Sequence, residues 1–166
     1  MVRLAKIDDI DRIVEIKNLA IAQMGKNNIY QWNELYPTKE DFLCDIKNET
    51  LYVVEENSKI GAAACIDQNI PSEYKDASFW SSNAPAYTMH RLVVDPLCTK
   101  KGYASLLMNK LEEIALYNNV TNIQIDTFSQ NYLAQNLFRK HGYIYVGDVH
   151  FRAKIEPFYC FEKMLT

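Results

Sequence analysis

Residues 90–104 read His90-Arg91-Leu92-Val93-Val94-Asp95-Pro96-Leu97-Cys98-Thr99-Lys100-Lys101-Gly102-Tyr103-Ala104. The first part is apolar and β-rich, and Asp95-Pro96 ends it because proline cannot donate to a sheet and restricts the residue before it. After Gly102, apolar residues recur at helical spacing through residue 115. The stretch therefore predicts a strand that leads through a short basic turn directly into an amphipathic helix.

The chemistry of this turn favours an anion. The first turn of a helix has unpaired N–H groups and a partial positive charge, so it can bind a phosphate. Gly102 would let the backbone approach the ligand closely, and Lys100 and Lys101 would add charge. A plain solvated turn is the alternative. The spacing matches neither a P-loop nor a dinucleotide-binding fingerprint.

Outward from this stretch, the patterns predict an α+β domain. A helix can be capped by Asp8 or Asp9, a second helix by Thr38 with Asp41, and Gly142 ends a later one. The element order is β-α-α-β-β-β-α-β-α-β-β, which predicts a central mixed sheet of about seven strands with about four helices in a single domain, 1–166. The predicted strands cover 2–5, 51–55, 60–66, 86–94, 121–126, 143–149 and 158–164; the helices follow residue 8 or 9 and residue 102, and cover 38–47 and 131–140.

Composition narrows the class of protein. The 166 residues are 48% hydrophobic and 23% charged, with a net charge of −3, so the chain lacks the basic character of a nucleic-acid binder. No apolar run approaches the ~20 residues that span a bilayer, and residues 1–12 do not resemble a signal peptide. The four cysteines form no C-x-x-C pair, so neither a zinc nor a redox site is expected. We expect a reduced, cytoplasmic protein without a metal or a membrane segment.

At this point the chain resembles the GNAT acetyltransferases. Thr99–Ala104 is similar to the family's [QR]-x-x-G-x-[GA], with Thr99 in place of Gln or Arg. The stretch Asn131-x-x-Ala134-x-x-Leu137-Phe138-x-x-x-Gly142-Tyr143 resembles its N-x-x-A-x-x-L-Y-x-x-x-G-F. Residues 31–38 are similar to a poorly characterised bacterial branch of the family. The resemblance covers nearly the whole chain.

The resemblance implies a site for acetyl-CoA. The strand at 90–94 would splay from the strand at 121–126, and the pantetheine arm would lie there, paired with the backbone of Leu92 and Val94. The N–H of Val93 or Leu92 would stabilise the oxyanion, a role that needs only an aimed amide. Further cofactor contacts are implied for Thr99, Lys100, Lys101, Gly102, Tyr103, Ala104, Ser105, Asn131 and Phe138.

Phe138 departs from the family in an important way, because the usual tyrosine would protonate the leaving thiolate. Three interpretations remain open. Another hydroxyl replaces it, with Tyr132, Tyr103 or Ser129 as candidates. Water protonates the thiolate. Or the protein binds acetyl-CoA with little turnover, as a sensor or interaction domain.

An amine must lose its proton before it attacks, so a base is expected. His90 and Asp126 are the candidates. For each, the favoured alternative is a structural role: a hydrogen-bonded strand histidine for His90, and a turn or cap residue for Asp126. The aromatics Tyr30, Trp32 and Trp80 fall in irregular segments and could line the acceptor site, or could seat those segments on the core. The expected activity is N-acetyl transfer from acetyl-CoA to a primary amine. A homodimer is compatible with the resemblance.

Overall fold

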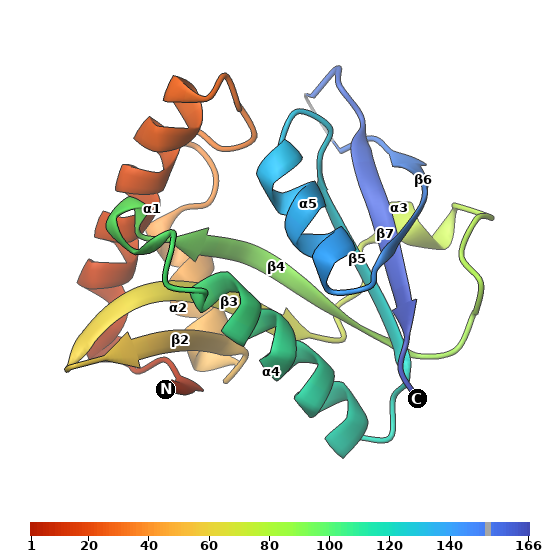
Figure 1. Cartoon of the computed structure of the whole chain (residues 1–166), viewed down its shortest axis with the longest axis horizontal. Helices are drawn as coiled ribbons and strands as arrows, with labels where there is room; N and C mark the ends of the chain where they lie inside the picture. Colours follow the sequence, from red (N-terminus) through yellow and green to blue (C-terminus); the bar gives the residue numbers. More distant parts are fainter. Residues whose placement is uncertain (152–153) are drawn as a thin grey trace. The chain divides into compact units, whose positions relative to one another are not determined.

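The elements form close to where the sequence predicts them (Figure 1). The computed structural model describes residues 1–151 and 154–166. Its strands are β1 (Val2–Leu4), β2 (Leu51–Glu56), β3 (Lys59–Asp67), β4 (Ala86–Val94), β5 (Asn122–Phe128), β6 (Ile144–Val149) and β7 (Phe158–Met164). Its α-helices are α1 (Ile10–Lys26), α2 (Lys39–Lys47), α3 (Ser72–Lys75), α4 (Tyr103–Tyr117) and α5 (Tyr132–Lys140). The short helix α3, which lies in the stretch predicted to be irregular, was not expected.

Of the two helix caps predicted for the first half of the chain, one forms as expected. At α2 the hydroxyl of Thr38 accepts from the amide of Asp41, and the carboxylate of Asp41 accepts from the amide of Thr38, so the predicted capping box is confirmed. The predicted cap of the first helix is wrong in detail. Asp9 stands at the N-cap of α1, but its side chain binds Arg3 and the amide of Lys6 instead of the helix. A 3-10 turn, Ile7–Asp9, precedes α1, and the contact between Asp9 and the amide of Lys6 closes this turn.

The predicted mixed sheet is confirmed. Its strand order is β1-β2-β3-β4-β5-β7-β6. β4 and β5 are parallel, whereas β1–β2, β2–β3, β5–β7 and β6–β7 are antiparallel. The described chain divides into two compact units, Met1–Ile66 with His90–Lys110 and Asp67–Met89 with Leu111–Thr166. Strand β4 and helix α4 contribute residues to both.

The first unit has its core between helices and sheet. Ile13 and Ile16 of α1 and Phe42 of α2 pack with Val53 of β2 and Ala63 of β3, and all five are fully buried. The apolar spacing of α1 and α2 therefore places both helices over strands β2 and β3 (Figure 1).

The second unit is built on β5, β7 and β6, and successive residues of β7 face opposite sides of the sheet. Phe161 meets Phe138 of α5 at a ring distance of 5.4 Å. The neighbouring Cys160 packs instead with Tyr74 of α3 and Phe128. Helices α5 and α3 therefore cover opposite faces of these strands, as Figure 1 shows.

Candidate active site

The turn after β4 is built as the sequence predicts. Asp95 ends the strand: its amide donates to the carbonyl of Gly61 at 2.8 Å, and its carboxylate accepts from the amide of Leu97 at 2.9 Å. A short 3-10 turn, Pro96–Cys98, follows. A second contact holds the same carboxylate, because Arg12 of α1 donates to it at 2.5 Å. Asp95 is thereby fixed to both β3 and α1.

Gly102 has the backbone conformation that the anion-binding reading requires. Its φ is +75°, in the left-handed region that favours glycine, and a Cβ atom there would meet nothing within 4 Å. The first hydrogen bond of α4 runs from the amide of Leu106 to the carbonyl of Gly102 at 3.1 Å. The first backbone amides of α4 therefore lie in a turn where the helix itself supplies no partner. The open space beside Gly102 leaves room for a phosphate group at the start of this turn.

The charged and polar side chains of the turn already have partners. Lys101 lies 3.2 Å from Glu56, and the hydrogen bond with Glu56 raises the pKa of Lys101 above its ordinary value. The hydroxyl of Thr99 donates to the carbonyl of Pro96 at 3.3 Å. Lys100 is exposed to solvent. The predicted anion contacts of this turn are thus best supplied by backbone amides, with Lys100 adding charge.

Tyr103 is buried against β3. Its hydroxyl donates to Glu56 at 2.5 Å, and its ring lies over Gly61. The hydrogen bond to Glu56, followed by burial, raises the pKa of Tyr103. Because its side chain is held against β3, the predicted cofactor contact of Tyr103 is left to its backbone amide. Its neighbours Ala104 and Ser105 complete the first turn of the helix.

Strand β4 carries the residues expected beside the thioester. Val93 is buried in the first core, whereas His90, Leu92 and Val94 are partly exposed. Arg91 has a positive φ of 53°, which nothing in the apolar run predicts. The regular alternation of buried and exposed side chains along β4 is interrupted around this residue.

In the second unit, Asp126 of β5 has a partner that the sequence did not reveal. The buried hydroxyl of Tyr74 donates to its carboxylate in a short hydrogen bond. Burial, followed by the charge of Asp126, raises the pKa of Tyr74 well above its ordinary value, so the tyrosine stays protonated as a donor. The two residues are 52 positions apart, and no spacing rule connects them.

The second motif lies around α5. Asn131 caps this helix, because its side chain accepts from the amide of Ala134 at 3.1 Å. Phe138 is buried, with its ring against Phe161 and Tyr143. Tyr132 opens the helix with 50% of its surface exposed. Among the alternative acids, Ser129 accepts from Gln135 through its backbone carbonyl.

The structure separates the predicted acceptor residues by environment. Trp32 is 8% exposed and belongs to the first core, and Trp80 donates its indole N–H to the carbonyl of Tyr74 at 3.1 Å. Tyr30 is 57% exposed. Both tryptophans therefore help to seat their segments, and Tyr30 presents its ring to solvent.

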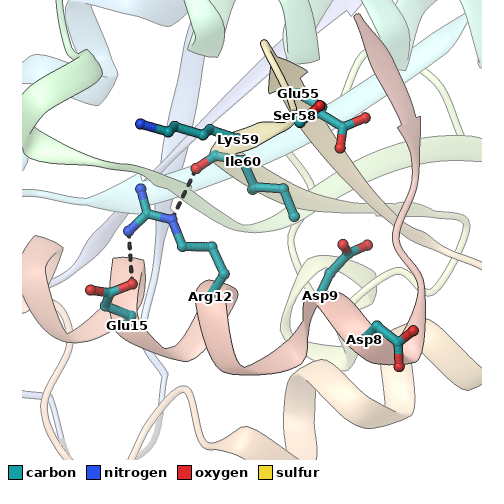
Figure 2. A pocket seen from close by; sticks show the side chains of 8 residues that line it. All are labelled: Asp8, Asp9, Arg12, Glu15, Glu55, Ser58, Lys59 and Ile60. Atoms are coloured by element: carbon teal, nitrogen blue, oxygen red, sulfur yellow. Dashed lines mark hydrogen bonds and ion pairs between the residues drawn. The ribbon is translucent and has the colours of Figure 1, made fainter.

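A hollow of about 480 Å³ in the first unit contains none of the predicted site residues. Figure 2 shows Arg12 there, donating to Glu15 at 2.9 Å and to the carbonyl of Ile60 at 3.1 Å. Arg12 and Glu15 at its wall are thus already paired with each other. The lining residues are Asp8, Asp9, Arg12, Glu15, Glu55, Ser58, Lys59 and Ile60.

Over residues 1–151 and 154–166, no cluster of three His, Cys, Asp or Glu side chains could hold a metal ion, and none of the four cysteines is in a disulfide. No helix within the same ranges combines the length and the apolar character needed to cross a bilayer.

Comparisons with known proteins agree with the motifs. The sequence model of the Acetyltransferase (GNAT) family matches residues 13–143. A candidate acetyltransferase of known structure from Staphylococcus aureus Mu50 is 32% identical, with 100% of this chain and 99% of that chain covered and a TM-score of 0.78. The comparison with curated proteins gave no match.

Two further structures share the fold at lower identity. A GNAT family acetyltransferase from Streptococcus agalactiae 2603 is 23% identical, with 100% of this chain and 95% of that chain covered and a TM-score of 0.87. A candidate acetyltransferase from Salmonella typhimurium, yncA, solved with its cofactor acetyl-CoA, is 17% identical, with 100% and 94% covered and a TM-score of 0.72. The chain therefore belongs to the GNAT family of acetyltransferases, and it is an acyltransferase with acetyl-CoA as its co-substrate.

Proposed function

We propose that this protein transfers the acetyl group of acetyl-CoA directly to a primary amine of a small molecule or a protein terminus. The observation that carries the proposal is the turn at Gly102. Gly102 has a left-handed φ and open space where a Cβ would stand, and its carbonyl accepts the first hydrogen bond of α4. A helix start of this kind suits a pyrophosphate, and it follows the strand that carries Leu92 and Val93. Acetyl-CoA supplies an activated thioester.

In the proposed reaction the neutral amine attacks the thioester carbonyl, and a C–N bond forms. The amide of Val93 or Leu92 donates to the oxyanion, an arrangement that contributes most when the donor is fixed in advance. The C–S bond then breaks, the thiolate takes up a proton, and the amine nitrogen loses one. The backbone of Leu92 and Val94 and the side chain of Asn131 are the proposed contacts of the pantetheine arm.

His90 and Asp126 are the proposed bases. His90 lies on β4, two residues before the proposed oxyanion amide. Asp126 is supported as a fixed carboxylate, because Tyr74 donates to it and stays protonated. Comparison of His90→Ala with Asp126→Asn distinguishes them: the base is the residue whose loss lowers kcat far more than acetyl-CoA affinity.

A second candidate function rests on Phe138. Its ring is buried against Phe161, and a phenyl ring has no proton to give. If neither Tyr132 nor water replaces it efficiently, the protein binds acetyl-CoA and turns over slowly, as a sensor or interaction domain. If the protein is an efficient enzyme, Tyr132 is the proposed acid, because it is the first residue of α5 and its side chain is exposed.

Calorimetry on the purified protein, followed by an amine screen, tests both functions. Acetyl-CoA is titrated first, with CoA, ATP and NAD as controls, and release of free CoA thiol is then followed over a panel of primary amines. Binding of acetyl-CoA with amine-dependent thiol release supports the transferase. Binding without release by any amine favours the sensor. Absence of acetyl-CoA binding overturns both.

The aromatic segments are the proposed source of acceptor selectivity. Tyr30 is the most accessible of the predicted acceptor contacts and could stack on a cationic amine. Trp32 and Trp80 would each shape its own segment, through the packing described above. We also propose a cytoplasmic location and a homodimer as the points to test after activity is established.

A further inference from the structure

Arg91 has a left-handed backbone conformation in the middle of a strand, which calls for an explanation. Among the described residues, the other non-glycine positions with positive φ lie in turns: Asn28, Glu49, Asn57, Ser58 and Asn119. Arg91 has φ +53° inside strand β4. This conformation is costly for any residue with a Cβ atom, and it persists only where the surrounding structure holds it.

An ion pair supplies that hold. The guanidinium of Arg91 donates to both carboxylate oxygens of Asp45, from Nε at 2.7 Å and from Nη2 at 2.6 Å. Its third nitrogen, Nη1, donates to the hydroxyl of Tyr36 at 3.1 Å. Both members of the pair are largely buried, with 16% and 8% of their side chains exposed. Asp45 sits on α2, which the core fixes through Phe42.

Burial along β4 departs from strict alternation around Arg91. Thr88 and Met89 are both buried although they are consecutive, residues 90–92 are all partly exposed, and Val93 is buried again. A single left-handed residue in a strand rotates the peptide groups that follow it and re-aims their side chains. The peptide groups that follow Arg91 include the amides of Leu92 and Val93, the proposed oxyanion donors.

We propose that Asp45 and Arg91 are positioning residues for acetyl transfer: their buried ion pair holds the left-handed backbone at residue 91 and so aims the oxyanion amide that follows it. The inference rests on the proposed function, because it assigns a purpose to the amide of Leu92 or Val93. Neither side chain needs to touch the substrate. The side chain of Arg91 matters only because it fixes the backbone.

A rescue experiment separates this role from general stabilisation. Asp45→Asn leaves the buried guanidinium without its charged partner and should lower kcat. Adding Arg91→Gly removes the buried charge and places at residue 91 the one residue that adopts positive φ freely. Adding Arg91→Val to the same background also removes the charge but opposes positive φ, because the side chain is β-branched. The two double variants therefore differ in backbone preference and share the loss of the ion pair.

We expect the double variant of Asp45→Asn with Arg91→Gly to regain most of the wild-type kcat, and the one with Arg91→Val to lose about 100-fold, the typical effect of removing an oxyanion donor. A binding readout needs no acceptor. Acetyl-CoA has the thioester carbonyl that the amide would contact and CoA lacks it, so the valine variant should lose affinity for acetyl-CoA by about fivefold and keep its affinity for CoA.

Equal kcat and equal acetyl-CoA affinity in the two double variants would overturn the inference. If the valine variant does not fold, Arg91→Ala takes its place, since one methyl group opposes the same φ with less bulk. A wild-type protein that acetylates no amine contradicts the proposed function, and the ratio of acetyl-CoA to CoA affinity still decides whether residue 91 aims the amide.

Discussion

The ring of Tyr103 covers Gly61 so closely that a Cβ atom at residue 61 would lie 2.4 Å from the ring. Strand β3 thus meets the first residue of α4 at a position that admits only glycine. The hydroxyl of the same tyrosine is held by Glu56 at 2.5 Å, so the ring cannot turn away without losing that bond. The end of the proposed phosphate-binding turn is thereby fixed on β3.

Gly61→Ala should destabilise the fold and weaken acetyl-CoA binding together. Overpacking of this kind typically costs about 1–3 kcal/mol, which corresponds to a fall in Tm of roughly 2–12 °C for a chain of this size. Thermal unfolding and calorimetry measure the two effects. Gly25→Ala is the matched control, because a Cβ atom at this helical residue meets nothing within 4 Å and alanine favours a helix. Equal Tm in the two variants would contradict the close contact.

The start of the turn depends on Arg12 and Asp95 in the same way. Asp95 is buried, and Arg12→Gln removes the charge that its carboxylate faces. We expect a loss of about 1–3 kcal/mol, the cost of leaving a buried charged group without its partner. Asp95→Asn in the same chain should recover part of it, because the amide oxygen can still accept from Leu97. A double-mutant cycle on unfolding free energies measures the coupling, and additive effects would show that the pair is not coupled.

Gly102→Glu should abolish measurable acetyl-CoA binding in a folded protein. The substitution places bulk, a negative charge and an unfavourable φ where the phosphates are proposed to lie. Gly102→Ala controls for the backbone effect alone and should cost only about 1–2 kcal/mol of stability. Calorimetry with acetyl-CoA and circular dichroism check binding and folding. Unchanged affinity in Gly102→Glu would remove this turn from the site.

These predictions mix what the sequence indicates with what only the structure shows. Thr38 with Asp41, Gly102 and Gly142 are local signals, and each forms the cap or turn expected, because the cause lies within a few residues of the effect. The contact of Gly61 with Tyr103 and the bond from Tyr74 to Asp126 join distant segments. Periodicity describes the face of one element, so it does not identify the partner that the fold brings to that face.

Phe138 and Arg91 show the same limit within the motifs. The resemblance marks Phe138 as a departure from the family, but only the structure shows its ring packed on Phe161. The apolar run from Leu92 to Val94 predicts an ordinary strand. The residue before it, Arg91, has instead a left-handed conformation and is paired with Asp45. At Arg91 a long-range contact overrides the local preference, whereas at Phe138 it supplies a packing partner that the sequence does not identify.

His141 should make stability depend on pH just below neutrality. Burial lowers its pKa from the ordinary value of 6.5. Well above pH 6.5, His141 is neutral in both the folded and the unfolded chain, so it does not make stability depend on pH there. As the pH falls, the unfolded chain takes up the proton first, so stability is lost from about pH 6.5 down to the lowered pKa. His141→Gln should flatten this part of a Tm–pH profile, and His150→Gln, at an exposed position, is the control. A steeper profile in His141→Gln would reverse the sign of the effect.

Tyr74→Phe should affect both stability and the proposed base. The substitution keeps the ring that packs on Trp80 and removes the hydroxyl that donates to Asp126. A hydrogen bond to a charged group typically contributes about 1.5–3 kcal/mol, so Tm should fall by several degrees. The carboxylate also loses a donor that favours its charged form. If Asp126 is the base, the acidic limb of the kcat–pH profile moves to higher pH in Tyr74→Phe, and Asp126→Asn loses turnover at every pH. If Tm falls while the profile keeps its place, the pair is structural and His90 becomes the base to test.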